Sequence, residues 1–248
     1  RKGELVTITA GSGVGKSSFC RHLALHLLKE KYSVGYLALE ENVKRSVLGI
    51  MGIEMGKPLH LTREGVKDSE MKKVFDSTVG NGDFYLYNHF GSTASDNLLA
   101  KIRYLAKGCE VDFVILDHLH MALSAIGDET TNDERKLIDY TVSKLRTLVE
   151  ETGIGLILVS HLKRPEGNKG YEDGVAVSMN SLRGSASIGQ LSDMIISMSR
   201  DLQSEGNIAR VNVLKNRFSG ETGLACTLHY DLETGCLQET KDDIHNDF

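Results

Sequence analysis

Residues 5–18 read LVTITAGSGVGKSS, and the interpretation of the whole chain starts from this stretch. Residues 5–9 form a short run rich in β-branched residues, which is typical of a buried strand. Glycines follow at positions 11, 13 and 15, and apolar residues at helical spacing begin at Leu23. A strand, a glycine-rich loop and a helix in this order predict a loop that binds phosphate groups.

Each residue of this loop has an expected role. Backbone N–H groups cradle the phosphates, and the Ser17 hydroxyl ligates Mg²⁺. The Lys16 side chain is expected to be exposed in the loop, with its ammonium reaching the β and γ oxygens. Ala10 stands where the strict pattern has glycine, and the alternative reading is a plain glycine turn beside a solvated lysine, which the strand and helix context disfavours. The residues expected to bind the nucleotide are Gly11, Ser12, Gly13, Val14, Gly15, Lys16, Ser17 and Ser18.

The alternation of strand and helix continues along the chain. Further strands are predicted at residues 33–39, 84–87, 112–116, 155–159, 194–198 and 210–214. One helix begins at Ser95 or Asp96, and another follows the capping-box pair Thr131 and Glu134. Continuous apolar strands predict an α/β fold whose mostly parallel sheet has helices on both faces, with the last two strands antiparallel at one edge.

Composition limits the class of protein. The chain has 248 residues, 40% of them hydrophobic, which suits one large domain at 1–238 followed by an acidic tail at 239–248. No apolar run is long enough for a membrane helix and no leader opens the chain, so a protein of the cytoplasm is expected. Because the first residue is Arg1 and a strand follows at once, we expect a piece of a longer protein.

Charge and cysteine usage exclude further classes. The net charge is -5, with 29 Lys and Arg against 34 Asp and Glu, so any binding to nucleic acid must rest on local basic residues. The four cysteines contain no C-x-x-C pair, which disfavours both a zinc site and a disulfide framework.

Carboxylates follow two of the predicted strands. Asp117 ends an apolar strand and is expected to hold Mg²⁺ together with Ser17. Glu40 ends the strand at 33–39, and in a parallel sheet the carboxyl ends of the strands share one crevice. Glu40 is therefore the predicted general base that polarises the attacking water, whereas Glu41 is expected to point elsewhere. The alternative is a pair of acids that favour the start of a helix.

Histidines and basic residues follow other strand ends. His161 lies at the end of the strand at 155–159 and is predicted to sense the γ-phosphate, while His118 and His120 are expected to pack locally. Long polar stretches at 124–133 and 163–180 are predicted loops. The second carries Lys163, Arg164 and Lys169, which we expect to contact DNA, unless they are ordinary solvated charges.

Several stretches together resemble one family. They are residues 11–18, 39–41, 116–118, 160–163, 182–185, 190–193, 215–220 and 222–223. In this order they resemble the DnaB-like class of ring helicases with a RecA-like P-loop NTPase core, and within it the helicase domains of T-seven type phage primase–helicases and of Twinkle. The resemblance covers nearly the whole chain.

The resemblance implies roles for residues outside the phosphate loop. Glu40 matches the catalytic glutamate and His161 the phosphate sensor, while Gln190 matches a glutamine that couples the nucleotide state to the DNA loops. Lys215 and Arg217 match residues contributed to the neighbouring subunit's site, with Arg217 as the arginine finger. Gly189 departs from the pattern, which has arginine there. The remaining matches are Arg200 and Tyr230, which sandwich the nucleotide base, and Lys163 and Arg183, which contact DNA.

The family implies a function. Its members hydrolyse nucleoside triphosphates, here ATP or dTTP with Mg²⁺, and move 5′ to 3′ along single-stranded DNA as rings, usually hexamers, while separating the duplex. A recombinase and a nucleotide-switched scaffold share this core and are the alternatives. The expected setting is the cytoplasm of a phage-infected host cell, and the chain contains no primase-like segment.

The terminal residues 241–248 read KDDIHNDF. They resemble the acidic, Asp-Phe-terminated tail by which the phage helicase contacts its replicative DNA polymerase. The resemblance implies that Phe248 enters an apolar pocket of that polymerase while the acids meet a basic patch. The alternative is a solubilising tail without a partner.

Overall fold

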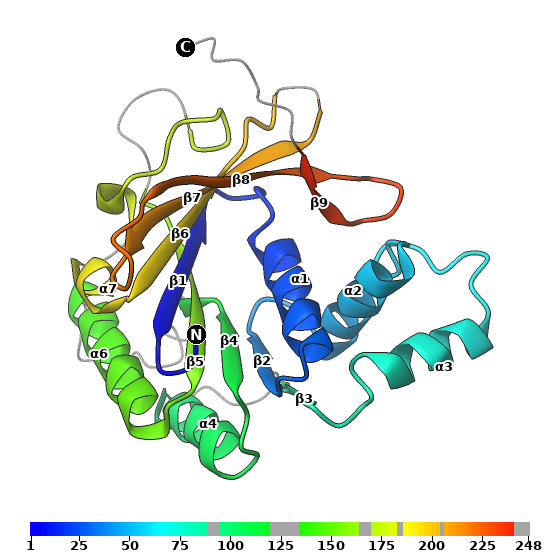
Figure 1. Cartoon of the computed structure of the whole chain (residues 1–248), viewed down its shortest axis with the longest axis horizontal. Coiled ribbons are helices and arrows are strands. Elements are labelled where there is room, and N and C mark those ends of the chain that lie inside the picture. Colours follow the sequence, from blue (N-terminus) through cyan, green and yellow to red (C-terminus); the bar gives the residue numbers. More distant parts are fainter. Residues whose placement is uncertain (89–94, 120–133, 164–169, 183–185, 204–205, 241–248) are drawn as a thin grey trace.

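One mixed sheet runs through the chain, with strand order β3-β2-β4-β5-β1-β6-β7-β8-β9 (Figure 1). The structure is a computed structural model that describes the chain apart from residues 89–94, 120–133, 164–169, 183–185, 204–205 and 241–248. The strands are β1 (Leu5–Ala10), β2 (Val34–Ala38), β3 (Phe84–Leu86), β4 (Phe113–Asp117), β5 (Gly155–His161), β6 (Met194–Ser199), β7 (Ile208–Asn216), β8 (Gly223–Tyr230) and β9 (Leu237–Thr240).

The sheet is parallel from β3 to β6 and antiparallel from β6 to β9. Strand β1 lies at its centre, where Ala10 is opposite His161 of β5 and Met198 of β6. The predicted mostly parallel sheet with an antiparallel edge is confirmed. The edge is longer than expected because β8 and β9 extend it beyond β7.

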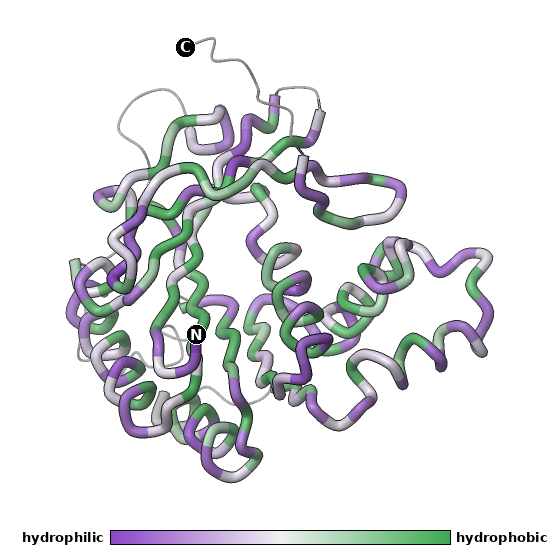
Figure 2. Tube along the Cα trace, viewed as in Figure 1, coloured by the Kyte–Doolittle hydropathy of each residue, from purple (hydrophilic) through white to green (hydrophobic). Residues whose placement is uncertain are grey.

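Helices cover both faces of the parallel part (Figure 1). The helices are α1 (Lys16–Lys29), α2 (Val43–Met55), α3 (Asp68–Ser77), α4 (Ser95–Lys107), α6 (Glu134–Thr152) and α7 (Ala186–Leu191), with a 3-10 turn, η1, at Met179–Ser181. Side chains alternate between two cores because successive strand residues point to opposite faces. Leu116 and Leu158 pack with α4 and α6, whereas Ile115 and Ile157 pack with α1 and α2. The central strands are accordingly apolar along much of their length (Figure 2).

The predicted elements match the observed ones closely. All seven predicted strands exist as β1 to β7, with ends within two residues of the expected positions. Helix α4 begins at Ser95 as expected, and α6 begins at Glu134. Thr131, the expected cap of α6, lies outside the described residues, as does the predicted loop at 124–133.

Two strands and three α-helices of the described chain were not predicted, namely β8, β9, α2, α3 and α7. Helix α2 contains Gly49 and Gly52, which lower helix propensity and hide the pattern. The structure requires these glycines, because a Cβ on Gly49 would lie 2.6 Å from Arg21 Cδ and one on Gly52 would lie 2.5 Å from the Lys57 carbonyl oxygen. Helix α3 buries none of its residues fully, so it has no strong apolar stripe to find.

The last strand of the sheet extends slightly past the expected domain boundary. Strand β9 ends at Thr240, two residues past the expected end of the domain at 238, and residues 241–248 lie outside the described part of the chain.

Among the described residues, no helix combines the length and apolar character needed to cross a membrane.

Candidate active site

The phosphate loop joins β1 to α1. Gly13 and Gly15 adopt φ values of +72° and +114°, a region that residues with a Cβ rarely occupy. Gly15 directly precedes α1, and within the described part of the chain no side chain caps that end of the helix. The first N–H groups of a 14-residue helix therefore face the loop, which is the arrangement that binds phosphate.

A later segment packs over the beginning of this loop. A Cβ on Gly11 would lie 2.8 Å from Tyr171 Cβ, and Tyr171 is buried with 7% of its surface exposed. Position 11 therefore needs glycine because another backbone approaches it. Tyr171 belongs to the predicted loop at 163–180, so this point of that loop lies directly beside the phosphate site.

Lys16 is held inside the loop rather than exposed as expected. Its ammonium donates hydrogen bonds to the carbonyl oxygens of Ala10 at 3.0 Å and Gly11 at 2.9 Å. Burial lowers the pKa of Lys16, and the nearby carboxylates of Asp117 and Glu40 oppose that effect. The ammonium is thus held at the loop's own carbonyl groups.

Asp117 and Ser17 have the chemistry of a divalent metal site. Asp117 ends β4 with 3% exposed surface, and its Oδ1 has no hydrogen-bond partner among the described residues. Burial raises the pKa of this carboxyl, while a hydrogen bond from Ser17 and the proximity of His118 act in the opposite direction. A buried carboxylate oxygen without a partner, beside a hydroxyl, suits a hard cation, so these residues fit the expected metal.

Glu40 and Glu41 have different surroundings. The Glu41 carboxylate pairs with Arg21 of α1 and accepts a hydrogen bond from Ser46 at 2.7 Å. Arg45 lies 3.7 Å from the same carboxylate. The Glu40 side chain is 50% exposed and faces the phosphate crevice near Lys16. Glu41 therefore has a structural environment, and Glu40 is the acid available to a ligand.

Glu40 lies in a cluster with His118 and His161. His118 Nε2 contacts Glu40 Oε1, and the Nε2 atoms of His118 and His161 are 2.8 Å apart. The ligand atoms of all three lie within 4.8 Å of one another. The cluster forms because β2, β4 and β5 are neighbours and end at the same edge. His118 was expected to pack locally, and its contact with Glu40 and His161 is a finding of the structure; His120 lies outside the described residues.

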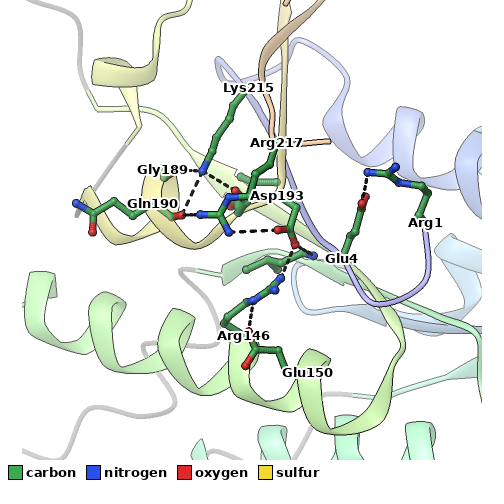
Figure 3. Close-up of polar contacts among 12 residues, drawn as sticks. Arg1, Glu4, Arg146, Glu150, Gly189, Gln190, Asp193, Lys215 and Arg217 are labelled. Atoms are coloured by element: carbon green, nitrogen blue, oxygen red, sulfur yellow. Dashed lines mark hydrogen bonds and ion pairs between the residues drawn. The ribbon is translucent and has the colours of Figure 1, made fainter. Parts of the chain in front are cut away.

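Gln190, Lys215 and Arg217 form a second group (Figure 3). The Lys215 ammonium donates to the carbonyl oxygens of Gly189 at 2.6 Å, Ser192 at 2.7 Å and Gln190 at 3.1 Å, and so caps the carboxyl end of α7. Arg217 donates to the Gln190 carbonyl oxygen at 2.6 Å. Burial lowers the pKa of Lys215, and the Arg217 charge adds to this effect.

This second group lies at the opposite end of β1 from the phosphate loop. Asp193, which is 3.4 Å from Arg217 Nη1, accepts a hydrogen bond from the backbone N–H of Leu5 at 2.9 Å. Leu5 begins β1 and Ala10 ends it, and the five residue-to-residue steps between them span about 16 Å. The structure therefore does not bring Gln190, Lys215 or Arg217 to the phosphate loop of their own chain.

Arg200 and Tyr230 are both attached to Asn207. The Arg200 guanidinium donates to the Asn207 side-chain oxygen, and the Tyr230 N–H donates to the Asn207 carbonyl oxygen at 2.9 Å. Arg200 directly follows β6, at the same end of the sheet as the phosphate loop. The structure thus places Arg200 and Tyr230, the expected base sandwich, around Asn207, with Arg200 at the phosphate-loop end of the sheet.

Of the expected DNA-binding residues, Lys163 is described. It is exposed, and its ammonium donates to the Asn180 carbonyl oxygen at 3.1 Å. Arg164, Lys169 and Arg183 lie outside the described residues.

His22 of α1 hydrogen-bonds to the last strand, β9. Its Nε2 accepts a hydrogen bond from the Leu237 N–H at 2.9 Å, and its Nδ1 is 2.9 Å from the Ser18 carbonyl oxygen. Since the N–H only donates and the carbonyl only accepts, His22 is neutral with its proton on Nδ1. Burial lowers the pKa of His22, which favours this neutral form. Strand β9 is thus fastened to α1 one turn from the phosphate loop.

Comparison with known proteins settles the family. Residues 1–238 match the model of the DnaB-like helicase C terminal domain. The chain belongs to this family. The predicted membership of the DnaB-like class is therefore confirmed.

Individual relatives agree with the family. The chain is 39% identical over 244 residues to the DNA helicase/primase of Enterobacteria phage T3, covering 96% of this chain and 43% of that protein. It is 29% identical over 238 residues to a probable plasmid replicative DNA helicase of Chlamydia trachomatis, covering 93% of this chain and 49% of that protein. The chain therefore spans less than half the length of these relatives.

Solved structures confirm the RecA-like fold of this domain. A DnaB-like replicative helicase superposes with a TM-score of 0.74 and 20% sequence identity, covering 96% of this chain and 57% of that chain. A KaiC-like protein of Pyrococcus horikoshii superposes with a TM-score of 0.63 and 16% identity, covering 96% of this chain and 90% of that chain. The predicted fold class is thus correct for the described part of the chain.

Proposed function

We propose that this DnaB-like domain is the motor of a replicative helicase in which hydrolysis at subunit interfaces drives 5′ to 3′ movement on single-stranded DNA and duplex unwinding. The observation that carries the proposal is the separation of the two half-sites. The phosphate loop lies at one end of β1, while Arg217 and Lys215 lie near the other end. A complete site then requires two subunits, with Arg217 supplied by a neighbour.

Two complementary half-sites at opposite ends of one subunit favour head-to-tail assembly. Such a heterologous contact repeats around a ring until it closes. The proposed assembly is a hexameric ring. Its hydrolysis depends on neighbours, because an arginine in trans supplies positive charge to the transition state.

The hydrolytic roles follow from the positions in the crevice. Lys16 and the loop N–H groups bind the phosphates, and Ser17 and Asp117 would hold Mg²⁺, which neutralises phosphate charge when bound. Glu40 accepts a proton from the attacking water, and His161 donates to the γ-phosphate. Arg200 and Tyr230 stack on the base of ATP or dTTP, since an aromatic ring and a guanidinium plane both pack on a purine or pyrimidine.

DNA and protein partners are assigned to the remaining positions. Lys163, Arg164, Lys169 and Arg183 would contact the phosphates of single-stranded DNA, and Gln190 would couple them to the nucleotide state. Residues 241–248 would bind the replicative DNA polymerase. The relationship to a phage helicase/primase supports a role inside the infected host cell.

The test is Glu40→Gln in the full-length protein, with the exposed acid of Glu64→Gln as the matched control. Glu40→Gln should keep nucleotide binding and lower DNA-stimulated turnover by roughly 10² or more, as expected for loss of a general base. Displacement of a strand from a forked duplex should fall equally. A variant that mainly loses nucleotide affinity would make Glu40 a structural acid, and hydrolysis that ignores single-stranded DNA would contradict the helicase assignment.

A further inference from the structure

The catalytic carboxylate stands at an exposed strand end. Half of the Glu40 side-chain surface is accessible, so packing alone does not fix its χ angles. A general base contributes fully only when its oxygen is aimed at the proton it accepts. Some other residue must therefore restrict where the Glu40 carboxylate points.

The backbone on either side of Glu40 is already fixed. The Leu39 N–H donates to the Asp117 carbonyl oxygen at 2.6 Å, which ties the preceding residue to β4. The following residue, Glu41, pairs with Arg21 on α1, and Arg21 is buried. The remaining freedom of Glu40 is in its side chain.

His118 is placed to remove that freedom. It follows Asp117 at the end of β4, has 3% exposed surface, and its Nε2 contacts Glu40 Oε1. Its ring packs edge-on against the His161 ring, with centroids 4.0 Å apart and an interplanar angle of 73°. A buried ring that packs on a neighbouring ring is a rigid support for the carboxylate it contacts.

We propose that His118 is a positioning residue that aims Glu40 and links it to His161. The proposal rests on the proposed function, in which Glu40 is the base and His161 contacts the γ-phosphate. His118 itself touches neither the nucleotide nor the attacking water in this assignment, so it acts through Glu40.

The hydrogen-bonding chemistry gives the link a direction. A carboxylate only accepts, so the His118 Nε2 must carry a proton and donate it to Glu40. His161 Nε2, 2.8 Å from the same nitrogen, then presents its lone pair and shares this N–H. When His161 turns to a γ-phosphate, the N–H belongs to Glu40 alone. The base is therefore held most firmly when the nucleotide is in place.

A pair of conservative variants tests the role in the full-length protein. The amide nitrogen of His118→Gln can take the place of Nε2 and keep the donor, whereas the shorter side chain of His118→Asn leaves its amide nitrogen short of Glu40. We expect His118→Asn to lower kcat by about 10- to 100-fold while KM and the Kd of a non-hydrolysable nucleotide change by less than about twofold. His118→Gln should recover kcat to within about threefold of the parent. The control is His26→Asn, because His26 is exposed on α1.

The same variants in a Glu40→Gln background decide whether His118 acts through Glu40. There, His118→Asn should lower the residual turnover by less than about twofold, because residues that act as one unit are non-additive. An undiminished kcat in His118→Asn, or an equal fold-loss in both backgrounds, would overturn the proposal. Normal turnover of Glu40→Gln by itself would instead refute the choice of Glu40 as base, so the two failures are distinguishable.

Discussion

Mixing two inactive variants tests whether Arg217 acts on the neighbouring subunit. Lys16→Ala removes the phosphate lysine but leaves Arg217, and Arg217→Ala does the reverse. In an assembly that contains both, an interface is complete where an Arg217→Ala subunit supplies the phosphate loop and a Lys16→Ala subunit supplies the arginine. Hydrolysis should therefore return on mixing.

The expected recovery follows from the arrangement along β1. The phosphate loop lies about 16 Å from Leu5, and Leu5 marks the end of β1 that lies near Arg217. Each interface therefore takes one half-site from each subunit. Random mixing in equal amounts completes about one quarter of the interfaces. Each variant alone should lose about 10³-fold or more in kcat if the arginine is a finger.

Loss of structure is not expected to obscure the result. The Arg217 side chain is 53% exposed, so its ion pair with Asp193 at 3.4 Å is open to solvent on the arginine side, and Asp193, which is 12% exposed, keeps Arg146 as a second partner. Such pairs contribute about 1 kcal/mol or less, so Arg217→Ala should still fold and assemble. In Lys16→Ala, water can donate hydrogen bonds to the loop carbonyl oxygens in place of the Lys16 ammonium, so this variant should fold as well.

The assay is nucleotide hydrolysis with single-stranded DNA in the full-length protein, titrated at constant total concentration. Activity should follow a symmetric curve with its maximum at equal amounts of the two variants. Mixed assembly is confirmed separately by labelling each variant with a different fluorophore. Activity no higher than the sum of the two variants, in assemblies shown to be mixed, would refute action in trans.

Three further changes have defined outcomes. Arg21→Met should lower the free energy of unfolding by about 2–4 kcal/mol in urea titrations, because it leaves the partly buried Glu41 without its main partner. Adding Glu41→Met should restore much of the lost stability, whereas an unchanged stability of Arg21→Met would mean that the ion pair is solvated. Neutralising Lys163 and Arg183 should reduce the slope of log affinity against log salt for single-stranded DNA by about 1 per lost contact, and an unaltered slope would make them ordinary surface charges. Deleting residues 242–248 should abolish binding of the replicative polymerase with hydrolysis intact, and equal binding by the shortened protein would contradict a docking tail.

The sequence predicts the convergence of Glu40, Asp117 and His161 because the ends of neighbouring parallel strands share one edge of the sheet. Glu40, Asp117 and His161 each follow an apolar run, and a parallel sheet places all such ends at one edge. Their convergence needs no knowledge of side-chain angles. The position of Lys16 at the loop carbonyls, by contrast, depends on the loop's own conformation, and the expectation of an exposed lysine was wrong.

Other features depend on contacts that pattern reading does not reach. The role of His118 depends on how the chain turns after β4, since its position next to Asp117 is compatible with a local packing role as well. Helix α2 was missed because its glycines indicate a break, whereas Gly49 makes room for Arg21 and Gly52 for the Lys57 carbonyl oxygen. The approach of Tyr171 to Gly11 joins residues 160 positions apart, and no local period carries that information.

The His22 hydrogen bonds couple the last strand, β9, mechanically to helix α1. A pull on the chain beyond Thr240 is transmitted along β9 to Leu237, and from there through a single imidazole ring to the Ser18 carbonyl oxygen. Load reaches the first turn of α1 without passing through the sheet's centre. A partner that pulls on the end of this chain would therefore displace the His22 ring and, through it, the Ser18 end of the phosphate loop. Force on the terminus and nucleotide binding are thus coupled through His22.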